Sequence, residues 1–372
     1  MSPKGMHDVA PAVEKALIIG APRKGTSEAK AVNEHLDELA RLLDTAGARV
    51  AGRLVQVVEK PSGEFYVGKG KVTEIAALIA EQGATIVVFD EELSPAQGKN
   101  LENELKVRIM DRTELILDIF AIRAKSHEAK MQVELAQLEY TLPRLTRMWV
   151  HLSRIRGGIG LRGPGETQLE TDRRMIRQKI GALKKKLDEV AEHRARGRTR
   201  TKERGILSVA IVGYTNAGKS SLLKALTRAP AHVEDRLFAT LDTQSRETVV
   251  SGRKVRFTDT VGFIRKLPHG LVASFRATLE EALDAGVLLH VVDASHPDWE
   301  EQAAVVGEAL DQAGLNGRRV VVALNKADRL DEPDRIHRLR AAEERGWEAV
   351  LVSAVNGTGL NDLAGRLVAA PP

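Results

Sequence analysis

The chain of 372 residues is long enough for two or three domains with a sizeable core. It contains no cysteine, which excludes disulfides and thiolate–metal sites, and no apolar run is long enough to span a membrane. The N-terminus lacks a hydrophobic signal region, so we expect a cytoplasmic protein, with peripheral attachment to a membrane left open. The net charge is +5, but residues 141–204 carry 18 Lys and Arg against 7 Asp and Glu. This local balance of +11 favours a polyanionic partner.

Residues 1–111 are predicted to form a small α/β subdomain. Short apolar runs alternate there with segments of helical spacing, which predicts a small parallel sheet covered by helices. Gly68-Lys69-Gly70 resembles a phosphate loop, but the stretch 61–70 is better explained as a loop that leads into a helix. The expected strands are 16–19, 49–58, 85–89 and 108–110, and the expected helices are 27–45, 71–81 and 95–105.

Residues 112–200 are predicted to form a helical arm of two long helices. The first runs from Thr113 to Pro143. The second begins at Thr167, whose T-x-x-E spacing to Glu170 fits a capping box, and extends for about 45 Å. We expect a coiled-coil-like hairpin, and packing of both helices flat on a neighbouring sheet is the alternative. The apolar faces are Met131, Leu135, Leu138 and Leu142 in the first helix, and Leu169, Ile176, Ile180, Leu183, Leu187 and Val190 in the second.

The connection over 153–168 is rich in glycine and arginine. Glycine allows the backbone to approach a surface closely, and arginine binds phosphates, so the segment is a candidate RNA-probing tip. A flexible connection is the alternative. The candidate RNA contacts are Arg154, Arg156, Arg162, Arg173 and Arg174.

Residues 205–372 contain the pattern that carries most chemistry. Gly213, Gly218, Lys219 and Ser220 fit G-x-x-x-x-G-K-[ST] between an apolar run and a helical segment. Such a loop directs backbone N–H groups at phosphates; its lysine reaches the β- and γ-phosphates, and its serine binds Mg²⁺. We therefore expect an open, mostly parallel sheet of P-loop type with helices on both faces.

The choice of base is predicted from Asn325-Lys326-Ala327-Asp328, which follows the apolar run 320–324. An aspartate there accepts from the ring N–H and the amino group of guanine, whereas adenine offers neither donor. Ser353-Ala354-Val355 follows another apolar run, and its backbone is a candidate donor to the guanine oxygen. Both segments indicate GTP and GDP as ligands.

Two further segments are expected to surround the γ-phosphate. Asp259-Thr260-Val261-Gly262 fits D-x-x-G, with Asp259 holding Mg²⁺ through water and the Gly262 N–H near the γ-phosphate. Upstream, Thr240 is the expected threonine on the metal, with Thr243 and Thr248 as alternatives. The residues predicted to be catalytic are Lys219, Thr240 and Gly262.

Two positions predict unusual catalysis. Phe263 occupies the place where many GTPases carry a glutamine that orients water, so we expect slow intrinsic turnover. Asn216 is a candidate K⁺ ligand, and a role limited to shaping the loop is the alternative. The complete set predicted to line the nucleotide site is Gly213, Tyr214, Thr215, Asn216, Ala217, Gly218, Lys219, Ser220, Ser221, Phe238, Ala239, Thr240, Leu241, Asp242, Asp259, Thr260, Val261, Gly262, Asn325, Lys326, Asp328, Ser353, Ala354 and Val355.

With these motifs in place, the chain resembles the HflX branch of the translation-factor-related GTPases over roughly residues 16–367. GYTNAGKSSL, FATLD, DTVGFI and NKAD carry the resemblance, and GLRGPGETQLE in the arm makes it specific. One departure is Thr243-Gln244-Ser245 after FATLD, where the family usually has Pro-Thr-Thr. Another is the end of the chain one helix after Ser353, which leaves no room for the extra C-terminal domain of many members.

The resemblance implies a monomeric GTPase that binds the large ribosomal subunit and its RNA, is activated by the ribosome, and splits stalled or idle ribosomes. Two other classes stay open. One is a ribosome-assembly GTPase, and the other is a nucleotide-gated RNA-binding scaffold whose hydrolysis is incidental.

Overall fold

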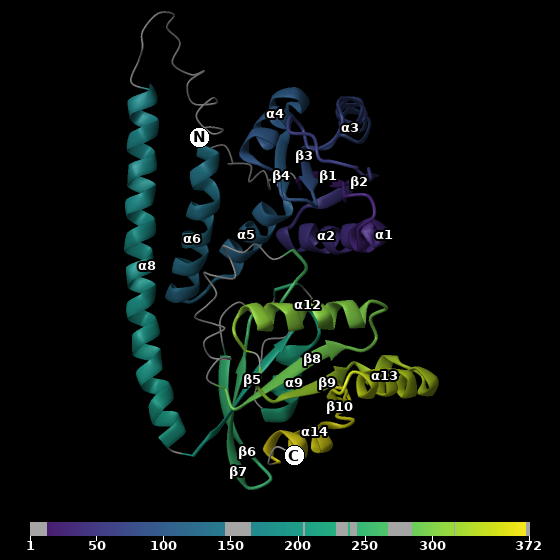
Figure 1. Ribbon diagram of the computed structural model, residues 1–372, viewed down its shortest axis with the longest axis vertical. Coiled ribbons are helices and arrows are strands. Elements are labelled where there is room, and N and C mark those ends of the chain that lie inside the picture. The colour runs from purple at the N-terminus through teal and green to yellow at the C-terminus, as the bar shows by residue number, and fades with distance from the viewer. Residues whose placement is uncertain are drawn as a thin grey trace, which may run out of the picture. The chain divides into compact units, whose positions relative to one another are not determined.

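The computed structural model describes residues 13–145, 165–203, 205–227, 237–238, 244–266, 285–315 and 317–369 (Figure 1). The chain divides into two compact units. One unit includes Met1–Ile119 and Pro143–Leu169, and the other includes Phe120–Leu142 and Glu170–Pro372. The residues predicted as a separate helical arm are thus shared between the units, and the three predicted parts, 1–111, 112–200 and 205–372, stay a prediction.

In the first unit, four parallel strands form a sheet in the order β2-β1-β3-β4. This confirms the small parallel sheet that the alternation of apolar and helical segments predicts. The strands are β1 (Lys15–Gly20), β2 (Arg49–Val55), β3 (Ile86–Phe89) and β4 (Arg108–Asp111), and the helices between them are α1 (Ser27–Lys30), α2 (Val32–Ala46), α3 (Lys69–Gln82) and α4 (Pro95–Leu105).

The starts of α2 and α3 differ in how well the sequence predicts them. The helix predicted over 27–45 is interrupted at Ala31, which ends α1 and precedes α2. Gly68 is the N-cap of α3 with an extended backbone (φ −72°, ψ 155°), so Lys69 and Gly70 form the first turn of that helix. The structure therefore agrees with a loop that leads into a helix at this position.

In the second unit, six strands form a sheet in the order β10-β9-β8-β5-β7-β6. All neighbours are parallel except β6, which pairs antiparallel with β7. The open, mostly parallel sheet of the sequence prediction is confirmed. The strands are β5 (Leu207–Gly213), β6 (Gln244–Val250), β7 (Arg253–Asp259), β8 (Val287–Asp293), β9 (Val320–Asn325) and β10 (Glu348–Leu351).

Helices cover this sheet. The helices α12 (Trp299–Gln312) and α13 (Glu332–Glu344) share a buried apolar cluster with β8 and β9. The helices α9 (Lys219–Thr227) and α14 (Leu360–Val368) contact each other, and both contact the sheet. The strands β5, β8 and β9 are mostly buried, and they carry the loops at the carboxyl edge of the sheet, where ligands of open α/β sheets bind.

The helix predicted from Thr113 to Pro143 is two helices, α5 (Arg112–Arg123) and α6 (His127–Thr141). The break arises because Ser126 caps α6, its hydroxyl accepting the Ala129 N–H at 3.1 Å. A 3₁₀ turn, η1 (Leu142–Arg144), follows and includes Pro143. The expectation of one continuous helix was wrong: α5 ends at Arg123, and a new helix begins after the capping serine, with no glycine or proline to mark the break.

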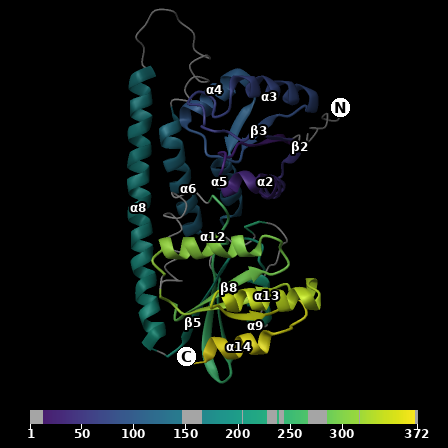
Figure 2. The ribbon, with the colours of Figure 1, turned by 45° about the vertical axis from the view of Figure 1, so that its right-hand side comes forward.

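The second long helix, α8, runs over Gly165–Glu203, 39 residues or about 58 Å. It begins before Thr167, so the predicted capping box at Thr167 was wrong: that residue lies inside the helix. Helices α6 and α8 lie side by side (Figures 1 and 2). The predicted apolar faces meet there, with Met131, Leu135 and Leu183 buried and Leu138, Ile180, Leu187 and Val190 packed against them.

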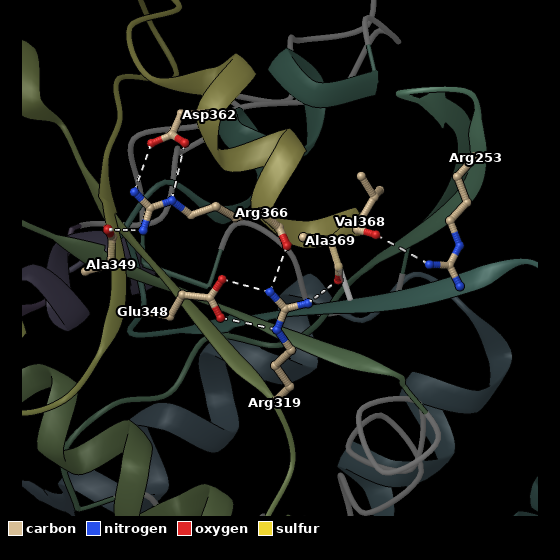
Figure 3. Close-up of polar contacts among 8 residues, drawn as sticks. All are labelled: Arg253, Arg319, Glu348, Ala349, Asp362, Arg366, Val368 and Ala369. Carbon is tan, nitrogen blue, oxygen red and sulfur yellow. Dashed lines mark hydrogen bonds and ion pairs between the residues drawn. The ribbon is translucent and has the colours of Figure 1, made fainter. Parts of the chain in front are cut away.

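The end of α14 is held by arginines (Figure 3). Arg319 forms two hydrogen bonds with the Glu348 carboxylate, at 2.8 and 3.2 Å. Its guanidinium also donates to the carbonyl oxygens of Arg366 and Ala369, at 2.9 and 2.7 Å. The last carbonyls of a helix lack partners within the helix, so these bonds satisfy them and tie α14 to β9 and β10. Within the described part of the chain, no helix is long and apolar enough to cross a membrane.

Candidate nucleotide-binding site

The phosphate loop connects the end of β5 to the start of α9, as the sequence predicts. Two glycines are required by close approaches of other groups. A Cβ atom on Gly213, whose φ is +155°, would lie 2.3 Å from the Val291 carbonyl oxygen, and one on Gly218, at φ +94°, would lie 2.3 Å from Asn325 Nδ2. Neither position accommodates another residue without a shift of its neighbours, which explains the two fixed glycines of the motif.

Lys219, at the first turn of α9, is buried. Its ammonium group donates to the carbonyl oxygens of Gly213 at 3.2 Å and Tyr214 at 2.9 Å. Burial lowers the pKa of Lys219 to about 8, and the nearby Asp259 carboxylate opposes this only in part. A desolvated cation at a helix N-terminus is a site for an anion. The negative charge of a polyphosphate would compensate the ammonium there.

Ser220 and Asp259, the two residues expected at the metal, are in contact. The Ser220 hydroxyl donates to Asp259 Oδ2 at 2.6 Å, although the residues come from α9 and the end of β7. A hydroxyl and a carboxylate are oxygen ligands of the kind that Mg²⁺ takes together with phosphate oxygens and water. The described residues contain no cluster of three or more His, Asp or Glu side chains suited to a metal. The pair therefore fits an ion that is held jointly with a nucleotide.

The D-x-x-G segment is bound to the phosphate loop through its backbone. The Thr215 N–H donates to the Phe263 carbonyl at 2.7 Å, and the Phe263 N–H donates to the Gly213 carbonyl at 3.1 Å. Gly262 lies so close that a Cβ there would be 2.8 Å from Thr215 Cα and 2.9 Å from Lys219 Nζ. The Gly262 backbone thus borders the lysine ammonium, where a γ-phosphate is expected.

The side chains of two residues in or next to this segment point elsewhere. The Thr260 hydroxyl donates to the Ile211 carbonyl at 2.8 Å and so faces β5. The Phe263 side chain is buried. A buried phenyl ring accepts and donates no ordinary hydrogen bond, so Phe263 cannot orient water.

Of the upstream segment predicted to close over the γ-phosphate, Phe238 is described, whereas Ala239, Thr240, Leu241, Asp242 and Thr243 lie outside the described residues. The Phe238 N–H donates to Thr215 Oγ1 at 3.0 Å. Its buried ring packs edge-on against Phe120, with ring centroids 4.5 Å apart. The alternative residue Thr248 lies within β6 opposite Val255, away from Asp259 at the end of β7.

The predicted base-binding residues meet at the ends of β9 and β10. Asn325 Nδ2 donates to the Ala217 carbonyl at 2.9 Å, and Asn325 Oδ1 accepts the Ala354 N–H at 3.2 Å, so one side chain joins three loops. The Ser353 hydroxyl donates to Asp328 Oδ1 at 2.5 Å. The Val355 N–H donates to Ser353 Oγ at 3.3 Å. A contact of the 353–355 backbone with the guanine oxygen stays a prediction.

Three other predicted positions are described individually. Asn216 is exposed with φ +61°, a left-handed backbone that asparagine adopts more readily than most residues, which agrees with a role in shaping the loop. Arg174 is exposed, and Arg173 is half-buried, 3.9 Å from Glu170. Arg154, Arg156 and Arg162 lie outside the described residues.

Sequence reasoning missed two polar contacts. The Tyr214 hydroxyl accepts the Arg265 N–H at 2.9 Å and adds a contact between the phosphate loop and the segment after D-x-x-G. Asp293, at the end of β8, pairs with Lys326 at 2.7 Å. A signal for Asp293 exists: a carboxylate directly follows the apolar run 287–292, at the strand end where ligands bind.

A parallel sheet with a phosphate loop after β5, a carboxylate beside that loop at the end of β7, and N-K-x-D at the end of β9 defines a P-loop GTPase. Family models match along the chain: a GTP-binding GTPase N-terminal region over residues 33–121, a GTP-binding GTPase middle region over 123–201, and a 50S ribosome-binding GTPase domain over 208–326. The three models follow one another along the chain without overlap.

Similar proteins from two bacteria are both named GTPase HflX. The chain is 50% identical over 327 residues to GTPase HflX of Caldanaerobacter subterraneus subsp. tengcongensis, which covers 88% of this chain and 75% of the relative. It is 44% identical over 331 residues to GTPase HflX of Escherichia coli K12, covering 89% and 77%. A crystal structure of a protein named SsGBP in complex with GDP is similar at a TM-score of 0.51 and 26% identity, covering 95% of this chain and 97% of that one.

The chain belongs to the HflX family of GTPases. It binds guanine nucleotides and hydrolyses GTP, and its GTPase domain is of the ribosome-binding kind. Dependence on Mg²⁺ is typical of this fold, and the Ser220–Asp259 pair fits that ion.

Proposed function

We propose that the carboxyl edge of the second sheet holds GTP with the roles that the sequence predicts. Lys219 and the Gly262 N–H contact the γ-phosphate, Asp328 reads the guanine base, and Ser220 and Asp259 hold Mg²⁺, the latter through water. When bound, the ion neutralises charge that develops on the phosphate oxygens. The closeness of Lys219 Nζ to Gly262, together with the Ser220–Asp259 contact, supports these roles.

Within the proposal, Thr240 completes the metal site, and Asn216 is a candidate K⁺ ligand. Phe263 leaves the attacking water without a side chain to orient it, so intrinsic turnover is slow. The missing group is then supplied by the activating partner, as it is for other GTPases whose activator contributes to the site.

The partner in this proposal is the large ribosomal subunit, and GTP-dependent binding dissociates stalled or idle ribosomes. The observation that carries it is the set of exposed basic side chains on α8, with Arg174 and Lys185 on one face of the helix. Arg174, Lys185 and Lys186 are exposed, and none of them pairs with an acidic side chain among the described residues. By contrast, Lys179 and Lys184 pair with Glu134 and Glu139 of α6, at 2.5 and 2.8 Å.

Uncompensated cations along a helix bind the phosphate backbone of RNA, with an affinity that falls as salt rises. Such a surface on a member of a family with a 50S ribosome-binding GTPase domain favours ribosomal RNA over other polyanions. The basic face alone fits the two alternatives, a ribosome-assembly GTPase and a nucleotide-gated RNA scaffold. What the GTP-bound protein does to whole ribosomes distinguishes these functions.

The test is sedimentation of whole ribosomes with the full chain and a non-hydrolysable GTP analogue. Dissociation into subunits supports splitting, and binding only to precursor particles supports assembly. Binding without either effect supports the scaffold.

A charge-reversed variant tests the α8 face. Arg174→Glu with Lys185→Glu is expected to weaken ribosome binding and to reduce the log–log salt slope by about two units. The matched control, Lys254→Glu with Arg340→Glu, makes the same charge change at exposed residues of β7 and α13. Equal weakening by both variants would show that net charge alone matters, which contradicts the assignment to α8.

A further inference from the structure

Asp293 ends β8 beside the predicted base-binding residues, and both oxygens of its carboxylate are engaged. In the sheet register it lies opposite Asn325. Its Oδ1 accepts the Ser295 hydroxyl at 2.6 Å and the Ser295 N–H at 3.1 Å. Its Oδ2 accepts from Lys326 Nζ at 2.7 Å. The carboxylate is therefore held in place by its own loop while it binds the lysine of a neighbouring strand end.

Lys326 is constrained at both ends. Its backbone has φ +64° and ψ 30°, the left-handed region that a lysine rarely adopts. Its side chain is 17% exposed and that of Asp293 is 13% exposed, so the pair is largely shielded from water. An ion pair with this degree of burial is screened less than a surface pair, and either partner left alone would be costly.

A second carboxylate lies two residues along the chain from Lys326. Asp328 accepts the Ser353 hydroxyl at 2.5 Å, whereas the ion pair of Lys326 goes to Asp293. A lysine ammonium on a flexible four-carbon stem turns readily to the nearest available carboxylate. Without Asp293, the nearest acidic group in the sequence is Asp328 itself.

Competition of the Lys326 ammonium for Asp328 matters because guanine binds the same carboxylate oxygens. The ring N–H and the amino group of guanine are both donors, and a carboxylate that is already paired with an ammonium accepts them less well. We propose that Asp293 is a positioning residue for guanine selectivity. By binding the Lys326 ammonium, it keeps the Asp328 carboxylate available to the base. The inference rests on the proposed base-reading role of Asp328.

The energetic scale follows from that competition. A hydrogen bond to a charged group contributes more than one between neutral groups, and partial occupation of Asp328 by Lys326 removes part of that contribution. We expect Asp293→Asn to lower GDP affinity by about tenfold, which corresponds to about 1.4 kcal/mol. ADP affinity is expected to stay the same, because adenine presents no donor pair to Asp328. The variant thus reduces discrimination rather than phosphate binding.

The experiment measures GDP and ADP binding to the full chain by calorimetry for four proteins: the unmodified chain, Asp293→Asn, Lys326→Met, and the double variant. Methionine keeps an apolar stem and removes the ammonium, so the competitor for Asp328 is gone. We expect the double variant to bind GDP as Lys326→Met does, so the loss caused by Asp293→Asn disappears in that background. Asp311→Asn, at an exposed carboxylate of α12, is the matched control and is expected to bind as the unmodified chain does.

Each outcome decides the inference. Unchanged GDP affinity in Asp293→Asn overturns it, and so does an additive loss in the double variant, because a purely structural role is not rescued by Lys326→Met. Where Asp293→Asn unfolds, Ser295→Ala carries the test. It removes the 2.6 Å bond that holds Asp293, and we expect a loss of GDP affinity of about threefold. Equal binding of GDP and ADP by the unmodified chain instead overturns the proposed base site, and the role of Asp293 with it.

Discussion

The two parallel sheets gather charged groups at the carboxyl ends of their strands, but they treat those charges differently. In the first unit, the Arg112 guanidinium is buried between Asp90, at 2.7 Å, and Glu38. Asp111 accepts the backbone N–H groups of Leu93 and Glu114, at 3.1 and 2.9 Å. The charges of this edge are compensated from within the protein.

At the same edge of the second sheet, the Lys219 ammonium donates its hydrogen bonds to carbonyl oxygens. Burial lowers its pKa to about 8, and the nearby Asp259 carboxylate opposes that shift only in part. Among the described residues no carboxylate forms an ion pair with it. The comparison shows how the same fold element serves two purposes. An internally neutralised edge stabilises its unit, whereas an edge whose buried cation is only partly compensated is prepared for an external anion.

The sharpest way to break this comparison is to remove the cation. Lys219→Ala is expected to reduce single-turnover GTP hydrolysis by about 10³-fold, because a positioned charge at the transferred phosphate disappears. The stability of the free protein should change little or rise, since a desolvated charge is removed. Rapid-quench assays with excess protein measure the rate, and a variant that retains more than a tenth of the activity would contradict the role assigned to Lys219.

The opposite result is expected in the first unit. Arg112→Met leaves Asp90 and Glu38 buried without their cation, which costs about 3–5 kcal/mol of unfolding free energy in that unit. GDP affinity should stay unchanged, because no part of the proposed nucleotide site lies in this unit. Hydrogen exchange followed on peptides from 13–111 reports the stability of the unit.

A conservative variant supplies the control. Arg112→Lys keeps the charge and loses the planar fork, so a smaller loss of stability is expected. If the peptides are protected from exchange in Arg112→Met as well as in the unmodified chain, the pairing of Arg112 with Asp90 and Glu38 does not stabilise this edge.

The sequence is sufficient for features that depend on near neighbours. Alternating βα segments predict the first sheet, and the phosphate-loop motif predicts the mostly parallel second sheet. The glycine pattern around Lys219 predicts the loop whose glycines have no space for a side chain. Features set by strand order are not predictable in this way. Asp293 meets Lys326 only because β8 lies beside β9, and Phe238 meets Phe120 only through tertiary packing.

Local chemistry also misled the sequence analysis in two places. Between α5 and α6, Ser126 caps the second helix without a glycine or proline to mark the break. At the start of α8, the T-x-x-E pattern at Thr167 imitates a helix start inside a helix that begins at Gly165. Residues that suit a cap occur inside helices as well as at their ends, so their presence alone does not fix where a helix begins.

The smallest expected effect is the uptake of protons when a nucleotide binds, and it measures the charge state of Lys219 directly. In the free protein at pH 8, about half of the Lys219 side chains are neutral, since the pKa is about 8. Phosphates of a bound nucleotide favour the charged form and raise that pKa, so binding takes up protons. Uptake should be near zero below pH 7, where Lys219 is already charged, and about half a proton or more at pH 8–8.5.

The sign for stability follows from the same shift. The folded pKa is lowered from 10.5 to about 8, so between these values the unfolded chain binds more protons at Lys219 than the folded chain does. The contribution of Lys219 to the unfolding free energy of the free protein therefore rises with pH across this window, while GDP affinity falls.

Calorimetry of GDP binding at pH 8.5 in two buffers of different ionisation enthalpy gives the number of protons directly. Lys219→Met is the control, because it keeps the apolar stem and has no proton to gain. Equal proton uptake by the unmodified chain and Lys219→Met would assign the proton to another group. Zero uptake by the unmodified chain would mean that Lys219 is fully charged before the nucleotide arrives, and the contrast between the two sheets would then rest on geometry alone.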